Sequence, residues 1–168
     1  MVDQTNRVQR LVLSAALAAA VFVATIIIRI PIPATGGYLN FGDAIIVLSS
    51  LLFGPIVGAI AGGVGACAAD IVGFPVFAIP TLVIKATMGL LIGIVGWRAS
   101  LWRAIIAALL GEAWMVFGYF AVESWIFTAS MGMTAALAEI YFNIIQASFG
   151  AAIGCTVYGT LRRQRSLS

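Results

Sequence analysis

Long apolar segments, separated by short stretches rich in proline, glycine or arginine, fill nearly the whole sequence. Most of them approach the roughly 20 residues that an α-helix needs to cross the hydrocarbon core of a membrane. Gly54-Pro55 forms a sharp break after a short apolar segment. The pattern therefore predicts an all-α integral membrane protein, a bundle of six transmembrane helices over residues 11–28, 41–53, 55–72, 80–97, 102–127 and 133–160.

Basic residues predict how these helices are oriented, because lysine and arginine are enriched in cytoplasmic loops. An even number of crossings must separate Arg10 from Arg98 if both lie inside. Four separate helices satisfy this condition, whereas a single kinked helix over residues 41–72 does not. Both termini are therefore expected in the cytoplasm. The basic residues that carry the argument are Arg7, Arg10, Arg98, Arg103, Arg162, Arg163 and Arg165.

Composition agrees with a membrane protein. The chain is 62% hydrophobic and 9% charged, whereas a soluble domain carries about 25% charged residues. No segment is polar enough to form a linker or a second domain, so residues 1–168 are expected to form a single transmembrane domain. The first apolar run lacks a small-residue cleavage site, which favours a retained helix over a signal peptide.

The sequence lacks the residues that several kinds of catalytic and metal-binding sites require. Histidine, the commonest general base and transition-metal ligand, is absent. Neither a phosphate-binding glycine loop ending in Lys-Ser/Thr nor a nucleophile elbow occurs. We therefore expect no enzyme activity, no cofactor and no metal site.

Polar side chains inside three apolar segments are the main functional signal. Ionisable residues within membrane spans usually face the bundle interior and mark a functional site. Lys85 lies in the fourth segment, Glu123 in the fifth and Glu139 in the sixth, all toward the outer ends of their helices. Polar neighbours share their helical faces. The predicted outer cavity is lined by Thr81, Lys85, Tyr119, Glu123, Glu139 and Asn143; the alternative is a purely structural ion pair of Lys85 with Glu123 or Glu139.

Other polar residues receive a structural prediction first. Glu112 and Gln146 lie deeper, where hydrogen bonds between helices are favoured. Asp43 opens the second helix and is suited to cap it. Asp70 lies near the outer face, and either Asp43 or Asp70 could pair with Arg29.

The outer loop from Arg29 to Gly42 could be a lid or an ordinary connector, since its composition fits both. Tyr38, Asn40 and Asp43 could touch a ligand from above.

The first helix carries small residues at four-residue spacing, which lets helix backbones approach closely in lipid. These residues are Ala15 with Ala19 and Ala16 with Ala20. Their face could pack inside the protein or dock on a partner helix.

Several motifs together are similar to a known family. The stretches are Tyr-Leu-Asn-Phe-Gly-Asp-Ala from Tyr38, Leu-Phe-Gly-Pro from Leu52, Pro-Thr-Leu-Val-Ile-Lys-Ala from Pro80 and Asn-Ile-Ile-Gln-Ala from Asn143. In this order and spacing they resemble the substrate-binding S components of energy-coupling-factor (ECF) vitamin transporters, over nearly the whole chain.

The resemblance implies a six-helix bundle with cytoplasmic termini in a prokaryotic plasma membrane. It implies a high-affinity outward pocket built from the first outer loop and the last three helices. It also implies that the alanine face of the first helix docks on a transmembrane coupling subunit driven by two ATPases. The branch it resembles most is assigned to vitamin B6 or hydroxymethylpyrimidine. Riboflavin stays open, as does pantothenate, whose carboxylate would use Lys85.

Two other functions remain as alternatives. A small proton-coupled transporter could work as a homo-oligomer through an embedded acid such as Glu112, and a membrane enzyme could use carboxylates alone.

Overall fold

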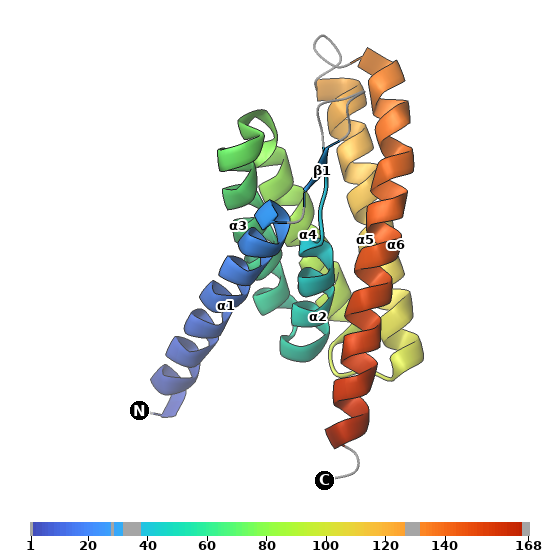
Figure 1. Ribbon diagram of the computed structural model, residues 1–168. Helices are drawn as coiled ribbons and strands as arrows, with labels where there is room; N and C mark the ends of the chain where they lie inside the picture. Colours follow the sequence, from blue (N-terminus) through green and yellow to red (C-terminus); the bar gives the residue numbers. More distant parts are fainter. Residues whose placement is uncertain (1, 28, 32–37, 127–131, 166–168) are drawn as a thin grey trace.

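The computed structural model describes residues 2–27, 29–31, 38–126 and 132–165. Within these ranges the six predicted helices are all present (Figure 1). They are α1 (Val2–Ile27), α2 (Gly42–Phe53), α3 (Pro55–Gly73), α4 (Ala78–Gly96), α5 (Leu101–Ala121) and α6 (Gly132–Arg165); shorter elements are the 3₁₀ turn η1 (Pro75–Phe77), the π-helical turn η2 (Val122–Ile126) and the strands β1 (Ile30–Pro31) and β2 (Tyr38–Leu39).

The helices differ in how far they can reach across a membrane. Among the described residues, five segments are long and apolar enough to span it: Arg7–Ile27, Pro55–Gly73, Pro75–Gly96, Leu101–Trp125 and Ala136–Gln164. Helix α2 has only 12 residues, or about 18 Å at 1.5 Å per residue. The predicted arrangement of six helices is present, and the second helix, short already in the sequence, is too short to be counted among these spans. It covers little more than half of a hydrocarbon core of roughly 30 Å.

The chain nevertheless reverses between α2 and α3, so the two helices form a hairpin (Figure 1). Gly54 has a φ of 96°, a conformation that glycine adopts without steric penalty. The Trp97 ring lies against it, 3.1 Å from where a Cβ would be. Pro55 then occupies the start of α3, where its missing N–H is harmless.

The arginines near the start of α1, in the α4–α5 connection and near the end of α6 lie at one end of the bundle. Helix α1 begins and α6 ends at the same end (Figure 1). The Arg98 N–H donates to the Leu51 carbonyl over 2.9 Å, and the Tyr158 hydroxyl donates to the Ala99 carbonyl over 2.7 Å. The α4–α5 connection therefore lies beside the end of α2 and the last turns of α6. This arrangement agrees with the charge argument, while the cytoplasmic assignment stays a prediction.

Small residues bring α3 and α4 together. A Cβ on Gly89 would lie 2.4 Å from the Gly58 carbonyl oxygen, so the two backbones are in direct contact. Close approach of this kind supplies the van der Waals contact that holds helices together in lipid. The centre of the bundle is filled by fully buried side chains, among them Val21, Ile46, Leu51, Met88, Ile92 and Met115.

Two local features were not predicted from the sequence. In the first outer loop, Ile30 pairs with Leu39 and Pro31 with Tyr38 in a short antiparallel ladder. Residues 32–37, the middle of the loop that could be a lid, lie outside the described residues. Helix α5 ends in the π-helical turn η2, which contains Glu123.

Candidate functional site

A cavity opens among the helices at the end opposite the basic residues. Its empty volume, including open solvent at the mouth, is about 520 Å³. Eight of the nine predicted site residues line it: Tyr38, Asn40, Thr81, Lys85, Tyr119, Glu123, Glu139 and Asn143. The ninth, Asp43, lies behind Lys85. Thr25, Ala66, Asp70, Phe74, Phe77 and Gln146 complete the lining.

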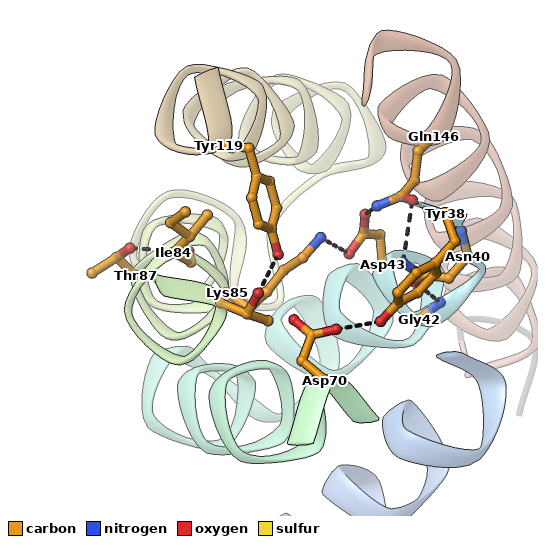
Figure 2. A network of polar contacts seen from close by, with 11 residues as sticks. Tyr38, Asn40, Gly42, Asp43, Asp70, Ile84, Lys85, Thr87, Tyr119 and Gln146 are labelled. Carbon is orange, nitrogen blue, oxygen red and sulfur yellow. Dashed lines mark hydrogen bonds and ion pairs between the residues drawn. The ribbon is translucent and has the colours of Figure 1, made fainter. Parts of the chain in front are cut away.

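An ion pair between α4 and α2 forms the deep side of the cavity. Lys85 Nζ lies 2.5 Å from Asp43 Oδ1, and both side chains are almost fully buried. Gln146 Nε2 donates to the other Asp43 oxygen over 2.7 Å. Figure 2 shows the three side chains pointing toward one another from three helices.

Two predictions are corrected by this ion pair. The residue that caps α2 is Phe41, without a side-chain hydrogen bond, so Asp43 is not the cap. Among the described residues, Asp43 is the ion-pair partner of Lys85, whereas the prediction named Glu123 or Glu139. A buried charge without a compensating partner is strongly destabilising, which explains why Asp43 pairs with Lys85 instead of capping α2.

Gln146, on α6, accepts hydrogen bonds from Asn40, which follows strand β2 of the first outer loop. Its Oε1 accepts from the backbone N–H of Asn40 over 2.9 Å and from the Asn40 side chain over 3.2 Å. Asn40 Oδ1 in turn accepts from the N–H of Gly42 over 3.0 Å, an Asx turn leading into α2. The predicted interhelical role of Gln146 is confirmed, and the residue also lines the cavity.

Tyr38 and Asp70 close another side of the cavity. The Tyr38 hydroxyl donates a short hydrogen bond to the Asp70 carboxylate (Figure 2). The Arg29 guanidinium lies 4.3 Å from the centre of the Tyr38 ring and donates to the Ala69 carbonyl over 3.0 Å. Asp70 therefore accepts a hydrogen bond from Tyr38, and Arg29 bonds to Ala69, instead of forming the predicted Arg29–Asp70 pair. Burial and, second, the Asp70 carboxylate raise the pKa of Tyr38 above the ordinary tyrosine value.

Replacing Tyr38 by phenylalanine tests this anchor through pH. A tyrosine in the unfolded chain ionises near about pH 10, while folded Tyr38 keeps its proton to higher pH. Its contribution to stability is therefore complete below about pH 10 and is lost as pH rises further. We expect Tyr38→Phe to lower the free energy of unfolding by about 1.5–3 kcal/mol at neutral pH, the range for hydrogen bonds to charged groups. Unfolding in mixed detergent micelles should show a shallower alkaline decline for the variant; parallel curves would contradict the assignment.

Aromatic side chains form one wall of the cavity. The Phe74 and Phe77 rings stack at 5.1 Å between centres, and Phe77 lies 6.2 Å from Tyr119. Tyr119 is held by a hydrogen bond of 2.9 Å to Thr81. The sequence prediction missed Phe74 and Phe77, although their position around Pro75 at an outer helix end was the available signal.

Acidic and amide groups form another part of the lining, the acidic wall, and some of their polar atoms are unsatisfied. Glu139 lies near enough for its charge to act on Glu123. Among the described residues, buried atoms without a hydrogen-bond partner include Thr25 Oγ1, Glu123 Oε2 and Asn143 Nδ2, all from residues that line the cavity. Such atoms are costly in a folded protein. A polar molecule in the cavity could satisfy them.

Comparison with known proteins decides the family. A family model described as "ECF-type riboflavin transporter, S component" matches residues 5–163. The chain belongs to this family. It is therefore a multi-pass membrane subunit of a transporter, in a family that is not one of enzymes. S components bind a vitamin and work with a membrane-embedded T subunit and ATPase subunits.

A relative also matches most of the length of this chain. A Pyrococcus woesei protein described as "Uncharacterized protein in gap 3'region" is 47% identical over 139 residues, which cover 80% of this chain and 89% of that protein. The resemblance to S components read from the sequence is confirmed, while the vitamin B6 or hydroxymethylpyrimidine branch stays a prediction.

Proposed function

We propose that this S component captures a small vitamin with a hydroxylated, nitrogen-containing aromatic ring at the outer membrane face, for ATP-driven uptake. The observation that carries the proposal is a cavity lined by aromatic and acidic side chains, with buried polar atoms left unsatisfied on Thr25, Glu123 and Asn143. In this proposal residues 1–168 form one substrate-binding domain.

Each wall suits one part of such a ligand. Aromatic rings stack favourably on flat heterocycles, so the ring would lie against Phe77 and Tyr119. Ionised carboxylates only accept hydrogen bonds, whereas an amide both donates and accepts. Ligand hydroxyls or ring N–H groups would donate to Glu123 and Glu139, and a ring nitrogen or carbonyl would accept from Asn143.

Charge favours some vitamins over others. Lys85 already has a carboxylate partner in Asp43, and the cavity lining contains Asp70, Glu123 and Glu139. An acidic vitamin such as pantothenate would add a negative charge to this set. Riboflavin, named in the family description, and pyridoxine or hydroxymethylpyrimidine, predicted from the motifs, are uncharged or basic and carry hydroxyl groups.

The test begins with the protein as it is purified. Mass spectrometry of the full chain in detergent identifies any small molecule that co-purifies. Calorimetric titrations with riboflavin, pyridoxine, hydroxymethylpyrimidine and pantothenate then rank the candidates. Saturable binding of one of the first three, at one molecule per chain, supports the proposal. Preference for pantothenate, or no binding by any of them to a protein that co-purifies with nothing, would overturn it.

We further propose that the basic end of the bundle is cytoplasmic and that α1 docks on the coupling subunit. The plasma membrane of a prokaryote is the expected location. Ala15, Ala16 and Ala19 are exposed on α1, which packs mainly on α3. An exposed face of small residues allows close helix approach, and it supports docking over internal packing for these three residues.

Bulky substitutions on this face should separate uptake from binding. In cells that contain the coupling subunit and ATPases, we expect Ala15→Trp and Ala19→Trp to reduce uptake to background while calorimetric affinity is unchanged. Ile94→Trp, on an exposed position of α4, is the matched control and should transport normally. Normal uptake by both alanine variants would rule out this face as the docking site.

A further inference from the structure

A carboxyl group outside the cavity lining is buried without any visible partner. Glu112, in the middle of α5, is 2% exposed, and among the described residues neither of its carboxyl oxygens has a hydrogen-bond partner. The side chain borders an apolar groove between α5 and α6, lined among others by Leu109, Val116, Phe120 and Ile144. The side chain therefore has an apolar environment on the groove side.

This group belongs to the same charge cluster as the deep ion pair. A Cβ on Gly150 would lie 2.4 Å from Glu112 Oε1 and 2.8 Å from the Asp43 Cβ, so only the space above a glycine separates the two acids. The charges of Asp43 and Lys85 both act on Glu112. On α6, the Cys155 thiol is near enough for the charge of Glu112 to act on it, and Gln146 Nε2 donates to Asp43. On α5 itself, Tyr119 lies two turns away toward the cavity.

Charge balance decides where a proton must lie. The cluster holds two carboxyl groups and one ammonium, and an unpaired ionised carboxylate away from water is too unstable to persist. Lys85 compensates one acid. Asp43 is the acid that receives both Lys85 and Gln146, whereas Glu112 receives no hydrogen bond. The proton is therefore on Glu112 in this arrangement.

We propose that Glu112 is a proton-binding site that serves as the reserve counterion of Lys85. In the arrangement seen here Asp43 is ionised and paired, and Glu112 is protonated. In the alternative arrangement Lys85 pairs with ionised Glu112, and the proton moves from Glu112 to Asp43. The ammonium and the proton exchange places, so the net charge of the cluster is the same in both.

The exchange would give Lys85 two depths relative to the cavity. Asp43 lies directly behind the cavity lining, whereas Glu112 borders the groove on the other side. A ligand that hydrogen-bonds to Asp43 would favour the deeper position of Lys85; this consequence rests on the proposed function, but the proton site does not.

Infrared spectroscopy of the purified, ligand-free full chain tests the proton site. A protonated carboxylic acid has its own C=O stretching band, and ¹³C-labelled glutamate moves this band only if the acid is a glutamate. We expect such a band at neutral pH in wild type, moved by the label, with a component that is lost in Glu112→Gln. Because Glu123 is also a buried acid with an unsatisfied oxygen, Glu123→Gln is the matched change in the cavity wall, and it should keep the Glu112 component. Absence of the band in wild type, or an unchanged band in Glu112→Gln, would overturn the proposal.

Asp43→Asn tests the exchange itself. Removing the Asp43 charge leaves Glu112 as the remaining acid of the cluster, so Lys85 should pair with it and the protonated-glutamate band should disappear at the same pH. Circular dichroism and gel filtration establish that the variant is folded. A Glu112 band that survives in folded Asp43→Asn would refute the exchange. If this variant does not fold, the label and Glu112→Gln still decide whether Glu112 carries the proton.

Discussion

The double replacement Asp43→Asn with Glu112→Gln is expected to lower the free energy of unfolding by about 3–5 kcal/mol, the usual result of leaving a buried charge without a partner. Lys85 is held 2.5 Å from Asp43, and the charges of this pair also act on Glu112. With both acids converted to amides, the ammonium loses its paired acid and its reserve acid.

The two single replacements are the reference against which the double replacement is interpreted. Glu112→Gln leaves the Asp43–Lys85 pair intact, so we expect a change within about 1 kcal/mol, and Asp43→Asn should cost about 1.5–3 kcal/mol as the loss of charged hydrogen bonds. Sites that share a partner are not additive. Unfolding in mixed detergent micelles, followed by circular dichroism, measures all three variants. A double variant that loses no more than the sum of the two singles would show that Glu112 does not support Lys85.

Polar positions within apolar helices were the part of the site that the sequence could predict. Lys85, Glu123 and Glu139 interrupt long apolar runs, and lipid excludes them from the outer surface of the bundle. Helical spacing then adds Thr81 and Asn143 to the same faces. These residues all line one cavity in the structure, because the helices have a single interior to which they can turn.

Pairing among those residues could not be predicted in the same way. Asp43 lies 42 residues from Lys85, and the sequence pattern favoured Glu123 or Glu139 as its partner. The choice depends on how far the short helix α2 enters the bundle, and local sequence does not encode this depth. The π-helical turn at Glu123 and the two-residue strands have too few residues to leave a periodic signal.

Structural and cavity residues were also harder to separate than the polar pattern suggests. Asp70 and Gln146 were assigned to structural contacts, and both make such contacts while lining the cavity. Phe74 and Phe77 are indistinguishable by composition from the many aromatic residues that face lipid. Only the turn at Pro75, which aims Phe77 inward, makes them part of the wall.

Removing single groups from the acidic wall is expected to weaken vitamin binding strongly. Glu139→Ala and Asn143→Ala should each reduce affinity by about 1–3 kcal/mol, the range for leaving a buried polar partner unpaired, or roughly 5- to 150-fold in Kd. Lys85→Ala should produce a loss of the same size. Because it also removes the partner of Asp43, its effect on binding must be read beside its effect on stability.

Calorimetry with the vitamin that the wild-type protein prefers provides the measurement, and Tyr141→Phe provides the control. Tyr141 lies on α6 between Glu139 and Asn143 in sequence but is 65% exposed, so it points away from the cavity and its variant should bind normally. The same helix thus carries both the test positions and the control. Wild-type affinity in Glu139→Ala and Asn143→Ala would place the vitamin elsewhere, because a ligand between the two walls cannot avoid contact with the acidic one.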